Sequence, residues 1–174
     1  MGDSGEIGDF SIEALYEALD ARRVELGLTW AEVTRQINDG FGAMPATRAI
    51  AGSTITGMRS RGSVEGDGVI QMLIWLGRAP ERFVVGGHDS VGEELARVGP
   101  NLILRWDAAA LHAAIDAERT DRGLTWKQIA DEIGCTPGSL TGLASSPRVA
   151  FPGVMRIVGW LGRPAAAFTR ASDW

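Results

Sequence analysis

The chain of 174 residues contains one segment twice, and this internal repeat constrains the fold more than any other feature of the sequence. Residues 15–37 match residues 111–133 at an offset of 96, with 10 identities in 23 positions. Residues 53–83 match residues 138–168 at an offset of 85, with 11 identities in 31 positions. The difference of 11 residues between the offsets indicates an insertion in the first copy, within residues 39–52. Two copies of one unit therefore account for most of the chain.

Both copies carry the same signals for the ends of helices. A first helix is predicted to begin at a capping residue and to end at a glycine in each copy. A second helix is predicted to begin with a capping box, Thr-x-x-Glu in one copy and Thr-x-x-Gln in the other. Apolar segments at residues 69–77 and 154–162 predict a central buried helix. The capping residues and glycines that carry these predictions are Ser11, Gly27, Thr29, Asp107, Gly123 and Thr125.

These patterns predict an all-α protein with two helical bundles in tandem, related by pseudo-symmetry. The expected division is an N-terminal tail at residues 1–10, a first domain at 11–84 with its insertion at 39–52, a linker at 85–105 and a second domain at 106–174. The linker is assigned from its glycine-rich composition. Four tryptophans recur at equivalent positions on apolar helix faces and are expected to pack in the core, namely Trp30, Trp75, Trp126 and Trp160.

Composition excludes several classes of protein. Hydrophobic residues make up 45% and charged residues 22% of the chain, as in a folded globular protein. The single cysteine, Cys135, allows no internal disulfide and no thiolate zinc cluster, and it is read as a small turn residue rather than as a redox sensor. The first ten residues resemble no signal peptide, and no run of about 18 apolar residues occurs. We therefore expect a cytoplasmic protein that does not enter a membrane.

The second copy carries the residues of a known motif. In GLTWKQIADEIGCTPGSLTGLASS, a small residue lies on the second helix, a glycine at the turn and a proline at the start of a short third helix. This pattern resembles the phage-repressor or Xre-type helix-turn-helix family, and the chain as a whole resembles tandem actinobacterial regulator-like proteins. The resemblance implies a transcription regulator whose third helix enters the major groove of double-stranded DNA. Two units in one chain would imitate a repressor dimer.

The resemblance also nominates site residues. The residues expected to face the groove lie on the third helix of each copy, and they are Thr54, Thr56, Arg59, Thr136, Ser139 and Thr141. The basic residues expected to neutralise nearby phosphates are Arg48, Arg61 and Arg148. The residues expected to face a phosphate at the start of the second helix are Thr29, Thr125 and Gln128.

A second function stays open, because the net charge is −5 and the third helix of the second copy has none of the usual base-reading residues. The alternative is a helical scaffold that binds another protein without binding DNA. A homodimer is also left open. Metal ligands at suitable spacing and enzyme motifs are lacking in the sequence, so no cofactor, no metal and no catalytic activity are expected.

Overall fold

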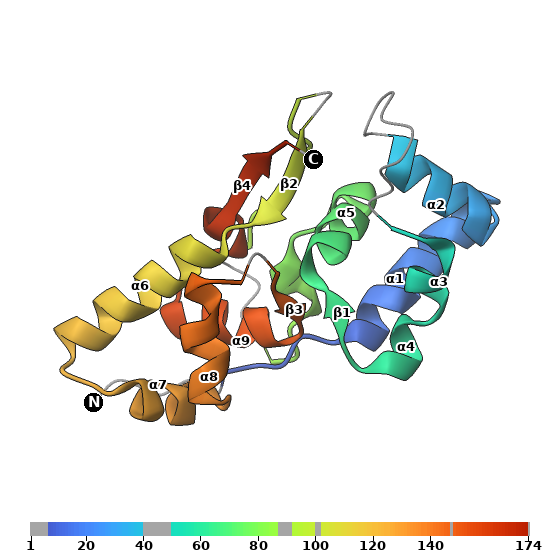
Figure 1. Cartoon of the computed structure of the whole chain (residues 1–174). Helices are drawn as coiled ribbons and strands as arrows, with labels where there is room; N and C mark the ends of the chain where they lie inside the picture. Colours follow the sequence, from blue (N-terminus) through green and yellow to red (C-terminus); the bar gives the residue numbers. More distant parts are fainter. Residues whose placement is uncertain (1–6, 40–49, 87–91, 100–101, 147, 174) are drawn as a thin grey trace.

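A computed structural model describes residues 7–39, 50–86, 92–99, 102–146 and 148–173. The first half contains α1 (Ile12–Glu25), α2 (Trp30–Asn38), α3 (Gly52–Thr56), α4 (Met58–Arg61), β1 (Val64–Glu65), α5 (Gly66–Leu76) and the 3-10 helix η2 (Pro80–Phe83). The second half contains β2 (Ile103–Trp106), α6 (Ala108–Asp121), α7 (Trp126–Ile133), α8 (Pro137–Thr141), η3 (Gly142–Ala144), β3 (Ala150–Phe151), α9 (Gly153–Leu161), η4 (Ala165–Phe168) and β4 (Thr169–Ser172). Figure 1 shows the two halves side by side, with β1 and β3 between them.

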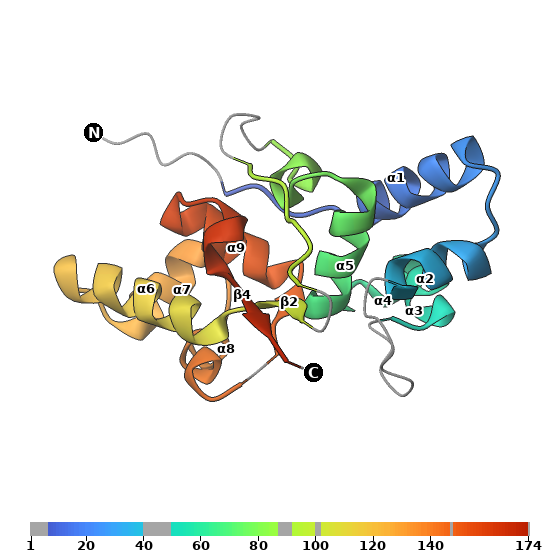
Figure 2. The ribbon, with the colours of Figure 1, turned by 90° about the horizontal axis from the view of Figure 1, so that it is seen from above.

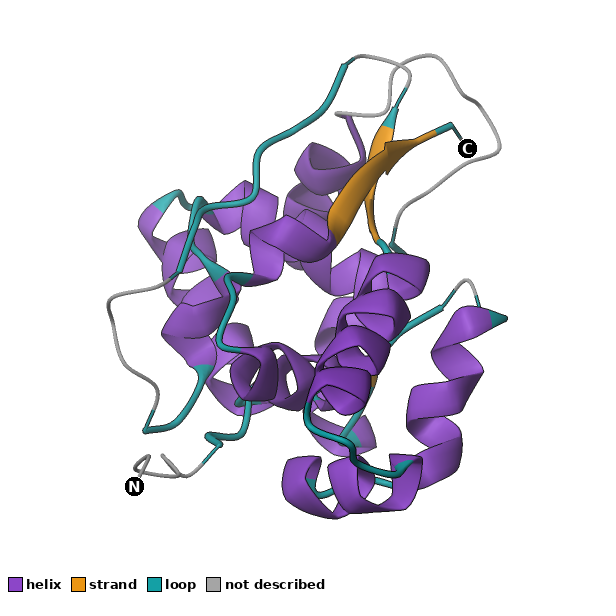
Figure 3. Ribbon diagram, turned by 90° about the vertical axis from the view of Figure 1, so that its left-hand side faces the viewer, coloured by secondary structure: helices purple, strands orange, loops and turns teal. Residues whose placement is uncertain are grey.

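The prediction of an all-α fold is wrong. The structure is mixed, with 61% helix and 9% strand, and the strands form two antiparallel two-stranded sheets. One sheet pairs β1 with β3. The other pairs β2 with β4, near the C-terminus (Figure 3). Strands of two to four residues are too short to show an alternating pattern, and each pairs with a segment far away in the sequence. No local signal therefore marked them.

The order of elements repeats between the two halves. Helices α1, α2, α3 and α5 correspond to α6, α7, α8 and α9, and β1 and η2 correspond to β3 and η4. The predicted capping boxes are confirmed, because Thr29 and Glu32, and likewise Thr125 and Gln128, form both of the reciprocal hydrogen bonds. These bonds satisfy backbone N–H groups that the first turn of a helix leaves without partners.

The seam between the two copies is a short antiparallel ladder with two-fold character. Glu65 pairs with Ala150, which is its own equivalent at the offset of 85. On one side of this pair Val64 lies opposite Phe151, and on the other the N–H of Gly66 donates to the carbonyl of Val149 at 2.7 Å. In the repeat, Val64 is equivalent to Val149 and Gly66 is equivalent to Phe151. The contact between Val64 and Phe151 therefore corresponds to the contact between Val149 and Gly66 when the two copies are exchanged. The copies therefore meet as two subunits of a symmetric dimer would, through the same segment of each.

A continuous set of buried apolar residues crosses this seam. The ring of Phe151 lies 4.8 Å from that of Phe10 and 5.5 Å from that of Trp106, measured between centroids. Trp106 is only 2% exposed, and its Nε1 donates to the carbonyl of Gly66 at 3.1 Å. These contacts join β2 of the second copy to α5 of the first, so both copies stabilise the same core.

The repeated tryptophans lie at different depths. Trp75 is buried, whereas Trp30, Trp126 and Trp160 are partly buried and lie against the core. Equivalent polar bonds hold two of them, since Nε1 of Trp75 donates to Gln36 at 3.0 Å and Nε1 of Trp160 donates to Glu132 at 2.9 Å. Each ring thereby joins the last long helix of its copy to the second helix.

Asp67, at the start of α5, makes the stability of the seam dependent on pH. Its Oδ1 accepts a hydrogen bond from the backbone N–H of Trp106 at 3.1 Å, and its Oδ2 lies 3.4 Å from Arg105. Burial raises the pKa of Asp67 above its usual value, although the N–H of Trp106 acts in the opposite direction. The folded protein therefore holds this proton more tightly than the unfolded chain.

In the parent protein the ionisation of Asp67 is expected to lower the free energy of unfolding as the pH rises. We expect Asp67→Asn to remove this decrease. For a raised carboxyl pKa, stability is highest below the ordinary Asp pKa and is lost as the pH rises through the folded pKa. The asparagine oxygen can still accept from Trp106, but the side chain no longer ionises. Urea unfolding should therefore show that the stability of the parent relative to Asp67→Asn decreases across this interval and is constant above it. A constant difference over the whole range would contradict the assignment.

Candidate nucleic-acid interface

The short third helices of the two copies lie on the same side of the molecule. In Figure 2, α8 lies at the lower left, below α9, and the pair α3 and α4 lies at the lower right, below α1. Each helix begins at an N-cap with extended backbone, Ala51 in the first copy and Thr136 in the second. The pseudo-two-fold relation at Glu65 and Ala150 accounts for this placement, because it repeats each element of one copy on the other side of the seam.

The basic residues of the first copy lie on α4. Arg59 and Arg61 are both exposed. Nη2 of Arg59 lies 2.8 Å from Oε1 of Glu13 on α1, and its guanidinium lies 5.1 Å from the centre of the Tyr16 ring. The hydrogen bond and charge of Glu13 raise the pKa of Arg59, so this cation stays protonated but is already paired. Arg61 donates to the carbonyl of Ser53 at 3.3 Å.

The hydroxyl groups expected to face DNA are largely engaged within their own helices. Oγ1 of Thr56 donates to the carbonyl of Gly52 at 3.3 Å, and Oγ1 of Thr141 donates to that of Pro137 at 3.2 Å. Oγ1 of Thr136 accepts from the N–H of Ser139 at 3.3 Å as the N-cap of α8, and the two hydroxyls lie 2.8 Å apart. All four of these side chains are exposed, yet each one forms a hydrogen bond within its own helix or helix cap.

Three nominated residues have different environments. Thr54 on α3 is half-buried. Arg148 is exposed, directly before β3, and its backbone N–H donates to Oγ of Ser146 at 3.3 Å. Arg48 lies outside the described residues.

The start of the second helix differs between the copies in charge. In the first copy the carboxylate of Glu32 accepts from the N–H of Thr29 at 2.7 Å, and this bond together with the Thr29 hydroxyl lowers the pKa of Glu32. In the second copy the neutral amide of Gln128 accepts from Thr125 at 2.8 Å. An anion is attracted to the positive end of a helix unless a carboxylate already occupies it. The start of α7 therefore lacks the negative charge that Glu32 places at the start of α2, and this difference is already visible in the sequence.

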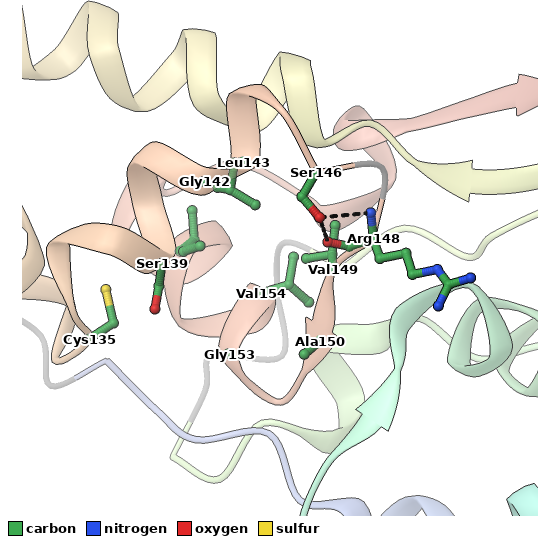
Figure 4. A pocket seen from close by; sticks show the side chains of 11 residues that line it. Cys135, Ser139, Gly142, Leu143, Ser146, Arg148, Val149, Ala150, Gly153 and Val154 are labelled. Carbon is green, nitrogen blue, oxygen red and sulfur yellow. Dashed lines mark hydrogen bonds between the residues drawn. The ribbon is translucent and has the colours of Figure 1, made fainter.

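A cavity beneath α8 is a feature that the sequence analysis missed. It has a volume of about 310 Å3 and lies between α8, η3 and α9 (Figure 4). Its lining is mostly apolar, including Leu143, Val154 and Ile157, with Ser139 and Ser146 among its polar groups. Figure 4 shows the guanidinium of Arg148 directed away from it. The sequence indicates this cavity only through smaller side chains in the second copy, such as Cys135 at the position equivalent to Ile50.

Cys135 borders this cavity and is half-buried. Burial raises the pKa of its thiol, although the charge of Arg156 acts in the opposite direction. A reactive thiol needs a lowered pKa, so the direction observed favours a small packing residue over a redox sensor.

No group of three or more His, Cys, Asp or Glu side chains is placed to hold a metal ion in the part of the chain that the structure describes. Among the helices described, none has the length and apolar character that crossing a membrane requires. Comparisons with protein-family models, with curated proteins and with solved structures find no match for the chain.

Proposed function

We propose that the protein is a sequence-specific regulator that binds double-stranded DNA through α3 and α4 of the first copy and α8 of the second. The observation that carries the proposal is the placement of these equivalent helices on the same side of the molecule, flanking a pseudo-two-fold seam (Figure 2). Dimeric helix-turn-helix proteins read the two halves of a pseudo-palindromic site with two-fold-related helices. This chain holds both units in one polypeptide.

The charge distribution favours unequal contributions from the two copies. Arg59 and Arg61 on α4 correspond to Ala144 and Ser146 in the second copy at the offset of 85. The first copy therefore supplies most of the positive charge for phosphate contacts, while the start of α7 is capped by a neutral amide rather than by a carboxylate that would repel a phosphate. Glu65 at the seam carries an acidic side chain, so the contacts are assigned to the flanking helices rather than to the centre.

Selection from a random library of DNA duplexes at low salt tests the function. We expect enrichment of sites with two half-sites in inverted orientation, one more strongly specified than the other. A library that shows no enrichment would overturn the proposal.

Within a selected site, we expect Arg59→Ala with Arg61→Ala to weaken binding and to reduce the slope of log affinity against log salt by about two, because each phosphate contact contributes about 0.9 to that slope. Glu13→Gln should act in the opposite direction, since it releases Arg59 from its ion pair. Arg78→Ala with Arg82→Ala removes the same charge from other exposed positions of the first copy and serves as the control. An equal change in slope for both double variants would remove α4 from the interface.

A protein-binding scaffold is the second candidate, and an exposed apolar pair favours it. Val24 is 61% exposed and Leu26 is 50% exposed, at the end of α1. The equivalent residues of the second copy are Thr120 and Arg122, which are polar. If the scaffold is the function, Val24→Thr with Leu26→Arg should abolish capture of a partner while leaving the fold intact. The same variant should leave DNA selection unchanged if the protein is a regulator.

A further inference from the structure

Several side chains that line the cavity beneath α8 are smaller than their equivalents in the first copy, among them Cys135, Ser139 and Ala150. Cys135 precedes the N-cap of α8, and Ile50 precedes the N-cap of α3, so the two occupy the same place in the repeat. Ile50 is 3% exposed. Replacement of isoleucine by cysteine removes branched apolar volume from beneath the helix.

The glycines at the starts of the long helices show the consequence directly. A Cβ atom added at Gly68 of the first copy would lie 3.3 Å from Cγ2 of Ile50. A Cβ atom added at the equivalent Gly153 would meet nothing within 4 Å. The amide of Asn38 holds Ile50 in place, donating to its carbonyl at 2.9 Å and accepting from its N–H at 3.2 Å. The side chain of Ile50 thus fills the space beneath α3 in the first copy, whereas the equivalent space beneath α8 is open.

We propose that this cavity is a binding site for a small neutral molecule with an apolar body and one hydrogen-bonding end. Its volume of about 310 Å3 lies at the lower end of the range found for ligand pockets, and an apolar cavity about half that size holds benzene. Leu143, Val154 and Ile157 provide apolar contacts for the body of the ligand.

The polar groups specify a neutral ligand rather than an anion. Ser139 is exposed at the rim, and its hydroxyl can accept from or donate to the polar end of an occupant. Arg148 is among the lining residues, but its guanidinium is directed away from the cavity (Figure 4). Because burying an anion without a partner is costly, a neutral molecule is preferred. The site does not depend on DNA binding, although an occupant would contact the short helix α8.

Indole, an apolar ring with one N–H donor, is a suitable test ligand for the full chain. Methyl-detected NMR titration should give saturable shifts at Leu143, Val154 and Ile157. The equivalent residues Met58, Val69 and Met72 of the first copy form an internal control and should not shift. No DNA is present, so failure of this test and failure of the DNA proposal are distinguishable.

Substitutions that place a larger side chain in the cavity should prevent the ligand from binding. Cys135→Ile introduces the side chain of the first copy, and Gly153→Ala adds a methyl group to open space. Each should weaken indole binding by about tenfold or more. Gly138→Ala, also in open space but outside the lining, should leave binding unchanged. Absence of saturable shifts, equal shifts in both copies, or unaltered affinity in both blocking variants would overturn the proposal.

Discussion

Trp106→Ala is expected to lower the free energy of unfolding by about 3–5 kcal/mol, the usual cost of truncating a buried large side chain to alanine. Trp106 is 2% exposed and belongs to the second copy, but its indole donates to the carbonyl of Gly66 and its backbone N–H donates to Asp67, both in the first. The substitution therefore removes apolar contacts at the seam and one hydrogen bond between the two copies. Urea unfolding followed by circular dichroism measures the loss.

Trp126→Ala provides a matched control for this prediction. Trp126 is partly buried, and its ring stacks on His112 with centroids 5.1 Å apart while the Arg119 guanidinium lies over it. Its truncation removes less buried surface and should cost clearly less than that of Trp106. Because one core crosses the seam, the parent and both variants should unfold in a single transition. Equal losses in the two variants, or separate transitions for the two copies, would contradict this description of the core.

Gly66→Ala is expected to disrupt the seam itself. The added Cβ would be forced against the carbonyl oxygen of Val149, which accepts the ladder hydrogen bond from Gly66, and would lie 2.8 Å from Cδ1 of Trp106. A backbone oxygen and a packed indole cannot move aside as the end of a flexible side chain can. The cost should be about 3 kcal/mol, the upper part of the range for overpacked cores.

The control for Gly66→Ala is Gly153→Ala, at the first residue of α9 as Gly66 is at the first residue of α5. A Cβ at Gly153 meets nothing within 4 Å, so alanine should be tolerated there or should stabilise the helix. Comparison of the two midpoints in urea separates the clash from any general effect of alanine at a helix start. A Gly66→Ala variant as stable as the parent would show that the ladder can open without cost.

The elements that sequence analysis predicted well are those defined by local chemistry. The capping boxes at Thr29 and Thr125 rest on side chains three residues apart, and the structure forms both. The seam could not be predicted in this way, because Val64 and Phe151 are distant in the chain and each strand has only two residues. Two-residue strands have no periodicity to detect, and their pairing depends on the packing of whole copies.

In the candidate site, too, local features could be predicted from the sequence and long-range contacts could not. The resemblance nominated exposed residues of α4 and α8, but the partner of Arg59 is Glu13, 46 positions away in the chain, and the hydroxyls of Thr136 and Thr141 satisfy the helix that carries them. Side-chain partners between distant elements follow from tertiary packing and leave no local pattern. In the sequence, the cavity corresponds to smaller residues at several lining positions, such as Cys135 in place of Ile50, and this equivalence is found only when the insertion is aligned with the turn.

The ladder at Glu65 and Ala150 joins its two halves within one covalent chain, so dilution cannot separate them. In a homodimer every mutation is inherited by both subunits and must suit both sides of the axis. Here a mutation changes one side only. Glutamate can therefore face alanine on the axis, arginines can accumulate on α4 alone, and a cavity can open beneath α8 alone. Within one chain, each half can therefore change without a matching change in the other.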